Sequence, residues 1–182
     1  ARLNVDGSLD ATFNVGTGAD NPVNTVAVDL NGRVYIGGQF TSVGGSTRGR
    51  IARLNVDGSL DSTFMNGLSG ANEAVNVVLP LPDGKVLIAG NFTLIHGVGR
   101  SRIARINSDG TLDNSFLPPS IDRAIRAMAL DAGGKILIGG DFTTVGNSFR
   151  GALARLNEGN GSLDTNFLNG VSGANPSGYV SD

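Results

Sequence analysis

A ten-residue segment that recurs roughly every fifty residues constrains this 182-residue chain more than any other feature. The segment Ala-Arg-Leu-Asn-Val-Asp-Gly-Ser-Leu-Asp begins at Ala1, returns nearly unchanged at Ala52 and Ala104, and returns with one extra residue at Ala154. The spacings are 51, 52 and 50 residues. Because fixed periods of this length are typical of propellers and solenoids, the chain is expected to consist of repeated structural units.

A second repeated block keeps the same period. Val-Tyr-Ile-Gly-Gly-Gln-Phe-Thr begins at Val34, and related segments begin at Val86 and Ile136. Residues 1–182 are therefore interpreted as one repeat region, with three complete units between two partial ones. The units are expected over residues 1–22, 23–74, 75–124, 125–175 and 176–182.

Each unit has the residue pattern of four short strands. In the first complete unit, two β-branched, apolar segments flank Asn31-Gly32, a hairpin signal in which both turn residues are expected to have positive φ. Asp57-Gly58 is expected to turn the chain again. The four strands are expected over residues 23–30, 33–40, 50–55 and 59–64. This predicts an all-β fold, a β-propeller of four-stranded antiparallel blades with about three and a half blades present. The alternative is a solenoid, but solenoid repeats pair in parallel.

Phenylalanines and glycines at equivalent positions predict how the blades pack. Seven of the eight Phe residues recur near strand ends and are expected to be packing anchors: Phe40, Phe92 and Phe142 after strand two, and Phe13, Phe64, Phe116 and Phe167 after strand four. The small-residue pairs at 37–38, 89–90 and 139–140 lie inside strands. They are expected to allow neighbouring blades to approach closely.

The repeated residues resemble the delta-sixty repeats of bacterial proteins, a β-propeller family of largely undefined function. The resemblance rests on Ala-Arg-Leu-Asn-x-Asp-Gly-Ser-Leu-Asp-x-x-Phe, followed after a variable link by Gly-Lys-[Val/Ile]-Leu-Ile-x-Gly-x-Phe-Thr, and it covers essentially the whole chain. It implies a propeller fold and a secreted or surface-attached location in a bacterium. It brings no common activity and no catalytic residues. The extra residue within 157–162 departs from the pattern and predicts a longer turn.

Composition argues against several classes of partner. The formal net charge is −2, so the chain has no strong positive field that would attract nucleic acid or anionic lipid. It has no run of ~18 apolar residues, which argues against membrane insertion. Without cysteine it has neither disulfides nor a thiolate nucleophile. His96 is the only histidine, which excludes a multi-histidine metal site.

Oxygen-bearing side chains alternate across the Asp-Gly turns and suggest calcium as an alternative to a metal-free turn. Against calcium, the pattern lacks the distant bidentate glutamate of an EF-hand, and an Asp-Gly turn needs no metal. The last Asp of each segment is also expected to pair with the repeated Arg, which is Arg2, Arg53, Arg105 or Arg155. We therefore expect no cofactor, with calcium as the alternative. Its candidate ligands are Asn4, Asp6, Asp10, Asn55, Asp57, Asp61, Asn107, Asp109 and Asp113.

The longer connections predict where a ligand would bind. The links from strand two to strand three, and from strand four to the next unit, leave the same end of a blade and vary most between units. Binding residues are often carried by such loops on a rigid scaffold. The least repetitive side chains of this loop face are Glu73, His96, Arg100, Asp122, Arg123 and Phe149. The alternative is that these are unconstrained loop positions.

Repetition itself bears on function. A catalytic site needs different residues that converge at one point, whereas this chain places similar residues at equal intervals. The sequence favours a non-enzymatic, secreted or cell-surface module for binding, adhesion or structural assembly, with a protein or glycan as ligand. The alternative is a targeting or substrate-binding propeller of a larger extracellular, carbohydrate-active enzyme. Three and a half blades do not close a ring, so the arc is expected to be partial or to be completed by another chain through self-association.

Overall fold

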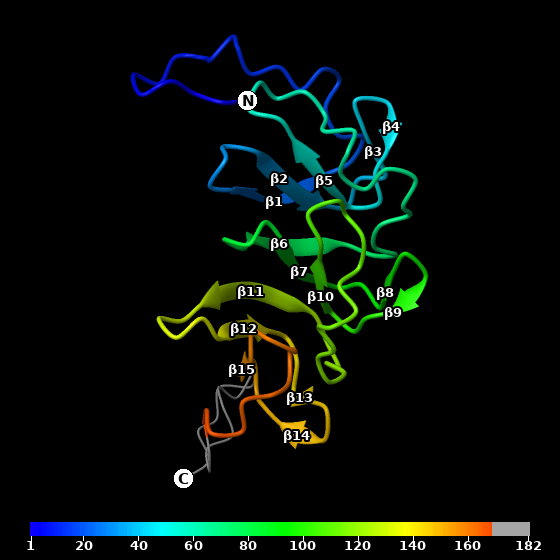
Figure 1. Cartoon of the computed structure of the whole chain (residues 1–182), viewed down its shortest axis with the longest axis vertical. Coiled ribbons are helices and arrows are strands. Elements are labelled where there is room, and N and C mark those ends of the chain that lie inside the picture. The colour runs from blue at the N-terminus through cyan, green and yellow to red at the C-terminus, as the bar shows by residue number, and fades with distance from the viewer. Residues whose placement is uncertain (169–182) are drawn as a thin grey trace.

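The structure is a computed structural model that describes residues 1–168; the predicted unit over 176–182 lies outside them. The described residues form fifteen short strands and no helix, and hence no helix long and apolar enough to cross a membrane. Three sheets of three antiparallel strands follow one another along the long axis (Figure 1). Blade one contains β1 (Val23–Val28), β2 (Val34–Gly38) and β5 (Ile51–Leu54); blade two contains β6 (Val75–Pro80), β7 (Val86–Gly90) and β10 (Ile103–Ile106); blade three contains β11 (Ile125–Leu130), β12 (Ile136–Gly140) and β15 (Leu153–Leu156).

The predicted fourth strand is reduced to one isolated bridge per unit. These bridges join Leu3 to Leu9, Leu54 to Leu60, Ile106 to Leu112, and Leu156 to Leu163. Pairing stops there because the next Asp bends the chain: Asp61 Oδ1 accepts hydrogen bonds from the backbone N–H of Thr63 at 2.9 Å and from its hydroxyl at 2.6 Å. Residues 1–13 repeat this arrangement without strands one and two beside them, and we call them the half-blade.

The turns between strands differ from the predicted two-residue type. Asp29 and Arg33 close a three-residue loop, in which the N–H of Gly32 donates to the carbonyl of Asp29 at 3.0 Å. Gly32 has a φ of 76°, whereas Asn31 is not among the described residues with positive φ. The expectation of positive φ at both positions is therefore wrong, because a type I turn followed by a left-handed glycine satisfies the hairpin. The longer turn expected at 157–162 is confirmed: the N–H of Asn157 donates to the carbonyl of Ser162, five residues on, whereas the N–H of Asn55 donates to the carbonyl of Ser59, four residues on.

The loop between strands two and three contains a small hairpin that the sequence did not predict. The three copies are β3 (Ser42–Val43) with β4 (Ser46–Thr47), β8 (Leu94–Ile95) with β9 (Val98–Gly99), and β13 (Thr144–Val145) with β14 (Ser148–Phe149). Each is tied to the preceding connection by one bridge, for example Ala71 to Ile95. The hairpins line one side of the arc in Figure 1, opposite the turns that join strands one and two.

The hydrophobic cores lie between the blades. One cluster joins Tyr35 and Ile51 of blade one to Val75 and Ile88 of blade two, and a second joins blades two and three. The predicted anchors Phe40, Phe64, Phe92, Phe116 and Phe142 are fully buried. Phe13 and Phe167, the first and last of the series, are only partly buried. Blade stacking thus supplies most of the core.

The paired small residues have two different packing roles. A Cβ on Gly37 would lie 2.7 Å from Val75 of the next blade, which confirms close blade-to-blade approach there. At Gly38 the close neighbour is the carbonyl oxygen of Pro22, 2.2 Å from such a Cβ and within the same blade. Gly90 and Gly140 show the same contact with Ala74 and Ala124. The second glycine therefore accommodates the chain that enters strand one.

Candidate functional site

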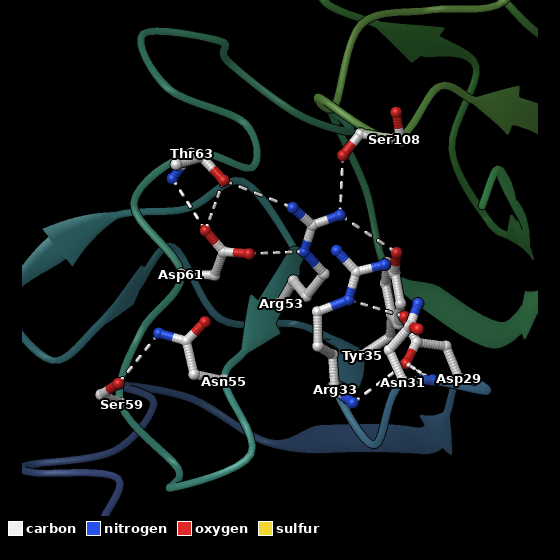
Figure 2. A network of polar contacts seen from close by, with 10 residues as sticks. All are labelled: Asp29, Asn31, Arg33, Tyr35, Arg53, Asn55, Ser59, Asp61, Thr63 and Ser108. Carbon is white, nitrogen blue, oxygen red and sulfur yellow. Dashed lines mark hydrogen bonds and ion pairs between the residues drawn. The ribbon is translucent and has the colours of Figure 1, made fainter.

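The repeated arginine is a clamp between successive blades (Figure 2). Arg53 on β5 donates from Nε to Asp61 Oδ2 at 2.7 Å, which confirms the predicted pair within the blade. Its Nη1 donates to the carbonyl of Ser108 in blade two at 2.7 Å. Its guanidinium also lies over the ring of Phe64, 4.7 Å from the centroid, a cation–π contact. Arg53 thus contacts both the segment after strand three in its own blade, through Asp61, and the equivalent turn of blade two, through Ser108.

The same clamp recurs along the chain. The Arg–Asp distance is 2.7 Å for Arg2–Asp10 and Arg105–Asp113, and 2.9 Å for Arg155–Asp164. Arg105 reaches the carbonyl of Glu158 in blade three at 2.6 Å. Burial raises the pKa of Asp61, but hydrogen bonds from Thr63 and Arg53 outweigh it and leave the pKa lowered. The repeated ion pair is therefore ionised and structural.

The candidate calcium ligands are divided between two hydrogen-bond networks. Asp10, Asp61 and Asp113 belong to the clamps, whereas Asp6, Asp57 and Asp109 cap their own turns. Asp57 Oδ1, for example, accepts the N–H of Ser59 at 2.9 Å and its hydroxyl at 2.6 Å, and Asn4, Asn55 and Asn107 donate to the same hydroxyl position. Across residues 1–168 no group of three or more His, Cys, Asp or Glu could hold a metal ion. Calcium binding stays an untested alternative.

Two of the six predicted loop-face residues, His96 and Asp122, bind backbone groups of other segments. His96 Nδ1 accepts the N–H of Gly70 at 3.0 Å, and its Nε2 lies 3.0 Å from the carbonyl of Gly110, which fits a neutral ring that donates there. Asp122 accepts the N–H groups of Thr143 and Thr144, both at 2.9 Å. Asp20 and Asn72 accept the equivalent hydrogen bonds in the earlier units. Asp122 is therefore part of the repeat pattern, and its prediction as one of the least repetitive side chains is wrong.

The other four predicted residues lie on the loop face with less constraint. Phe149 on β14 has 53% of its surface exposed, and Glu73 and Arg123 are exposed. Arg100 donates to Asn114 Oδ1 at 3.0 Å. These four side chains come from separate loops, and the structure does not bring them together with His96 and Asp122 into one pocket.

A polar pocket at the inner end of the loop face is the site that sequence reasoning missed. Its volume is about 470 Å³. It is lined by Asn24, Gln39, Ala74, Asn76, Asn91 and Arg126. We call the six polar side chains at this position the inner ledge: Asn24, Asn76 and Arg126 of strand one, and Gln39, Asn91 and Asp141 after strand two. They are one pair from each blade, so three blades contribute to a single site.

Hydrogen bonds link the inner ledge from blade to blade. Asn76 Nδ2 donates to Asn91 Oδ1 at 2.9 Å and to the carbonyl of Ile125 in blade three at 3.0 Å. Asn24 Nδ2 lies 3.4 Å from Asn76 Oδ1. Arg126 contacts Asp141 at 2.6 Å, and this pairing raises the pKa of Arg126 and lowers that of Asp141. The result is a neutral set of donors and acceptors.

A β-bulge explains why strand one presents these side chains. The pairing of β1 with β2 shifts between Val23 and Thr25, so Asn24 is the extra residue, and β6 and β11 shift in the same way at Asn76 and Arg126. A bulge turns the side chain of its extra residue away from the regular pleat. The sequence signal that could have revealed the ledge is variation at two polar positions of the repeat. The strand-one position is Asn, Asn and Arg in successive units, and the position after strand two is Gln, Asn and Asp.

Comparison with known proteins identifies the family. The model described as "Domain of unknown function (DUF5122) beta-propeller" matches residues 1–13, 30–64, 81–116 and 134–167, which is more than half of the chain. These segments contain strands two to four of each unit, and Asn24, Asn76 and Arg126 lie outside them. No curated protein matches the chain. The match confirms the resemblance to delta-sixty repeats, and the chain belongs to the DUF5122 β-propeller family.

Proposed function

We propose that this chain is a non-enzymatic binding module that holds a neutral glycan at the inner ledge. The observation that carries the proposal is the row of carboxamides contributed by successive blades to one pocket. A carboxamide presents both a donor and an acceptor, as does each sugar hydroxyl. The pocket volume of 470 Å³ lies within the range of roughly 300–1,000 Å³ that is common for small-molecule sites.

The free hydrogen-bonding capacity of the ledge supports a hydroxyl-rich ligand. Within residues 1–168 the Gln39 side chain has no hydrogen-bond partner, and both contacts of Asn24 Nδ2 are long, at 3.4 Å. The charges of Arg126 and Asp141 cancel, which favours a neutral ligand. Ala74 is the only apolar residue in the lining, so the pocket lacks the apolar subsites that peptide side chains require.

The number and pKa of carboxylates in the inner ledge favour glycan binding over glycan hydrolysis. Glycoside hydrolysis uses two carboxyl groups, one of them with a raised pKa. Asp141 is the only carboxylate of the ledge, and Arg126 lowers its pKa. The alternative of a substrate-binding propeller in a larger carbohydrate-active enzyme would use the same pocket. A secreted or cell-surface location stays a prediction from the family resemblance.

Side-chain amide resonances offer a direct test. Neutral oligosaccharides of gluco, galacto and manno configuration are titrated into ¹⁵N-labelled protein, and the NH₂ cross-peaks of Asn24, Gln39, Asn76 and Asn91 are followed. We expect these peaks to shift, and Asn76→Ala to weaken binding about tenfold, because about 1.4 kcal/mol of hydrogen bonding is lost. Asn31→Ala, at the opposite end of a blade, is the matched control. Ledge peaks that stay still, or an Asn76→Ala protein that binds as the wild type does, would refute the proposal.

A further inference from the structure

Positive charge is distributed unevenly between the two ends of the blades. Outside the loop face and the inner ledge, every Lys and Arg side chain contacts an Asp carboxylate, at 2.5–2.9 Å. These paired residues are Arg2, Arg33, Arg53, Lys85, Arg105, Lys135 and Arg155. The connections of the loop face contain six more arginines, none of which has an acidic partner among residues 1–168. These are Arg48, Arg50, Arg100, Arg102, Arg123 and Arg150.

Backbone carbonyls, rather than carboxylates, hold several of these arginines in place. Arg48, Arg100 and Arg150 occupy equivalent positions, and each donates from Nη1 to the carbonyl of the preceding residue, at 2.7, 2.7 and 2.8 Å. Arg50 Nη1 donates to the carbonyl of Ala71 at 3.0 Å. A carbonyl orients the guanidinium but carries no net charge, so the positive charge stays uncompensated. The loop face should therefore attract anions, although the net charge of the whole chain is −2.

A pocket beside Arg100 collects hydrogen-bond donors around one of these cations. It lies between the connection of blade two that contains β8 and β9 and the link to blade three, and its volume is about 260 Å³. Besides Arg100, its polar lining is Thr93, Ser101 and Ser120, and none of the residues that line it is Asp or Glu. Thr93 Oγ1 accepts a hydrogen bond from Asn72 Nδ2 at 3.0 Å, which leaves its own proton free to donate. The pocket therefore suits an acceptor-rich anion.

The Arg100 guanidinium is not arranged for a bidentate carboxylate. In the clamps the Nε of the arginine donates to the carboxylate, as Arg53 does to Asp61 at 2.7 Å. Arg100 Nε is instead buried without a hydrogen-bond partner among residues 1–168, and Nη1 and Nη2 already donate to the Gly99 carbonyl and to Asn114 Oδ1. A planar carboxylate binds best through two parallel N–H groups. The oxygens of a tetrahedral oxyanion point in several directions, which matches separate donors from one guanidinium and three hydroxyls.

We propose that the Arg100 pocket binds a tetrahedral oxyanion, the sulfate or phosphate monoester group of a larger ligand. One oxygen accepts a hydrogen bond from the guanidinium, and the others accept from the hydroxyls of the lining. Leu117 and Pro118 form the apolar part of the lining and contact the group that carries the ester. The pocket shares no lining residue with the inner ledge, so the proposal goes beyond the neutral glycan proposed there.

Chemical-shift titrations of ¹⁵N-labelled protein at constant ionic strength test the site. Inorganic sulfate and phosphate should shift the backbone amides of Ser101 and Ser120 saturably, and acetate should bind at least about tenfold more weakly. Arg100→Gln should weaken sulfate binding at least about tenfold, because it removes the only charge in the lining. Arg123→Gln is the matched control: it removes an exposed arginine of the same face and should change the affinity less than about twofold. Ser120→Ala, at an exposed position that should not affect folding, should weaken sulfate about threefold.

Two monoesters, galactose 6-sulfate and glucose 6-phosphate, distinguish the source of the oxyanion. Saturable binding of either supports the proposal, and the tighter of the two identifies the ester. Binding of sulfate without either monoester would mean an adventitious ion only. The proposal is also overturned if no inorganic anion saturates the shifts, if acetate binds as tightly as sulfate, or if Arg123→Gln weakens sulfate as much as Arg100→Gln does. Asn76→Ala should leave sulfate binding unchanged, so failure at this pocket and failure at the ledge are separate results.

Discussion

The half-blade and blade one have nearly the same sequence in this segment and the same Arg–Asp clamp, but the clamp is buried to different degrees in the two regions. Arg2–Asp10 and Arg53–Asp61 have the same 2.7 Å contact, but the Arg side chain is 38% exposed in the half-blade and 3% exposed in blade one. Leu3 is 63% exposed and its counterpart Leu54 is 4% exposed. Local sequence therefore determines the geometry of the clamp, whereas the neighbouring strands determine its burial.

Blade three shows an intermediate state of the same clamp. Arg155 is 25% exposed and still pairs with Asp164. Its Nη1 donates to Asp131 of the same blade at 3.1 Å, whereas the Nη1 groups of Arg53 and Arg105 donate to the carbonyls of Ser108 and Glu158. Since an ion pair gains strength as water is excluded, the four clamps should contribute unequally to stability despite their similar geometry.

Removal of the arginine should give the largest difference between the two regions. We expect Arg53→Ala to lower the free energy of unfolding by about 3–5 kcal/mol, because the buried Asp61 loses its charge partner and the turn of blade two loses a donor. Arg2→Ala should cost less than about 1 kcal/mol, because its pair is partly solvated. Urea unfolding followed by circular dichroism measures both. Arg105→Ala provides a second buried case, and equal losses for Arg2 and Arg53 would contradict the comparison.

Acid should release the half-blade clamp before that of blade two. Hydrogen bonds from Thr12 and Arg2 lower the pKa of Asp10 to about 2. Burial raises the pKa of Asp113, but bonds from Lys85, Ser115 and Arg105 outweigh it and hold it lower still. Because both pKa values are depressed by folding, both carboxylates stabilise the fold above the ordinary Asp pKa, and that stabilisation is lost as pH falls through each folded pKa.

A carboxyl ¹³C titration between neutral pH and strong acid tests this order. We expect Asp10 to titrate near pH 2 and Asp113 at lower pH. Lys85→Met removes the Nζ that lies 2.8 Å from Asp113 Oδ2, so it should raise the pKa of Asp113 toward that of Asp10. A wild-type Asp113 that protonates at a higher pH than Asp10 would show that burial, rather than hydrogen bonding, governs the clamp.

Features fixed by neighbouring residues were the ones that the sequence could predict. The positions of the Asn-Gly and Asp-Gly turns, though not their type, and the pairing of Arg53 with Asp61 depend on residues within eight positions of one another. The repeat period then predicted the blades. Arg53 was assigned only to its own blade because its bond to Ser108 spans 55 positions, a distance at which the sequence pattern carries no contact information.

The inner ledge was missed because it depends on register rather than on residue type. Strand one was interpreted as a regular β-branched segment over residues 23–30, without a bulge. The bulge between Val23 and Thr25 instead places Asn24 Nδ2 3.4 Å from Asn76 Oδ1 of blade two. The hairpins such as β3–β4 were missed for a related reason: two-residue strands leave no periodic pattern.

The smallest effect on stability is expected at the ledge ion pair. Arg126 and Asp141 approach to 2.6 Å, as closely as the clamp residues do, but their side chains are 60% and 48% exposed. We expect Arg126→Ala to change the free energy of unfolding by less than about 0.5 kcal/mol, since solvent screens such pairs. A loss as large as that of Arg53→Ala would mean that contact distance, not burial, sets the strength of ion pairs in this fold. If oligosaccharides bind at the ledge, Arg126→Ala should weaken their binding while the urea midpoint stays constant. That result would show that Arg126 contributes to binding and not to the stability of the fold.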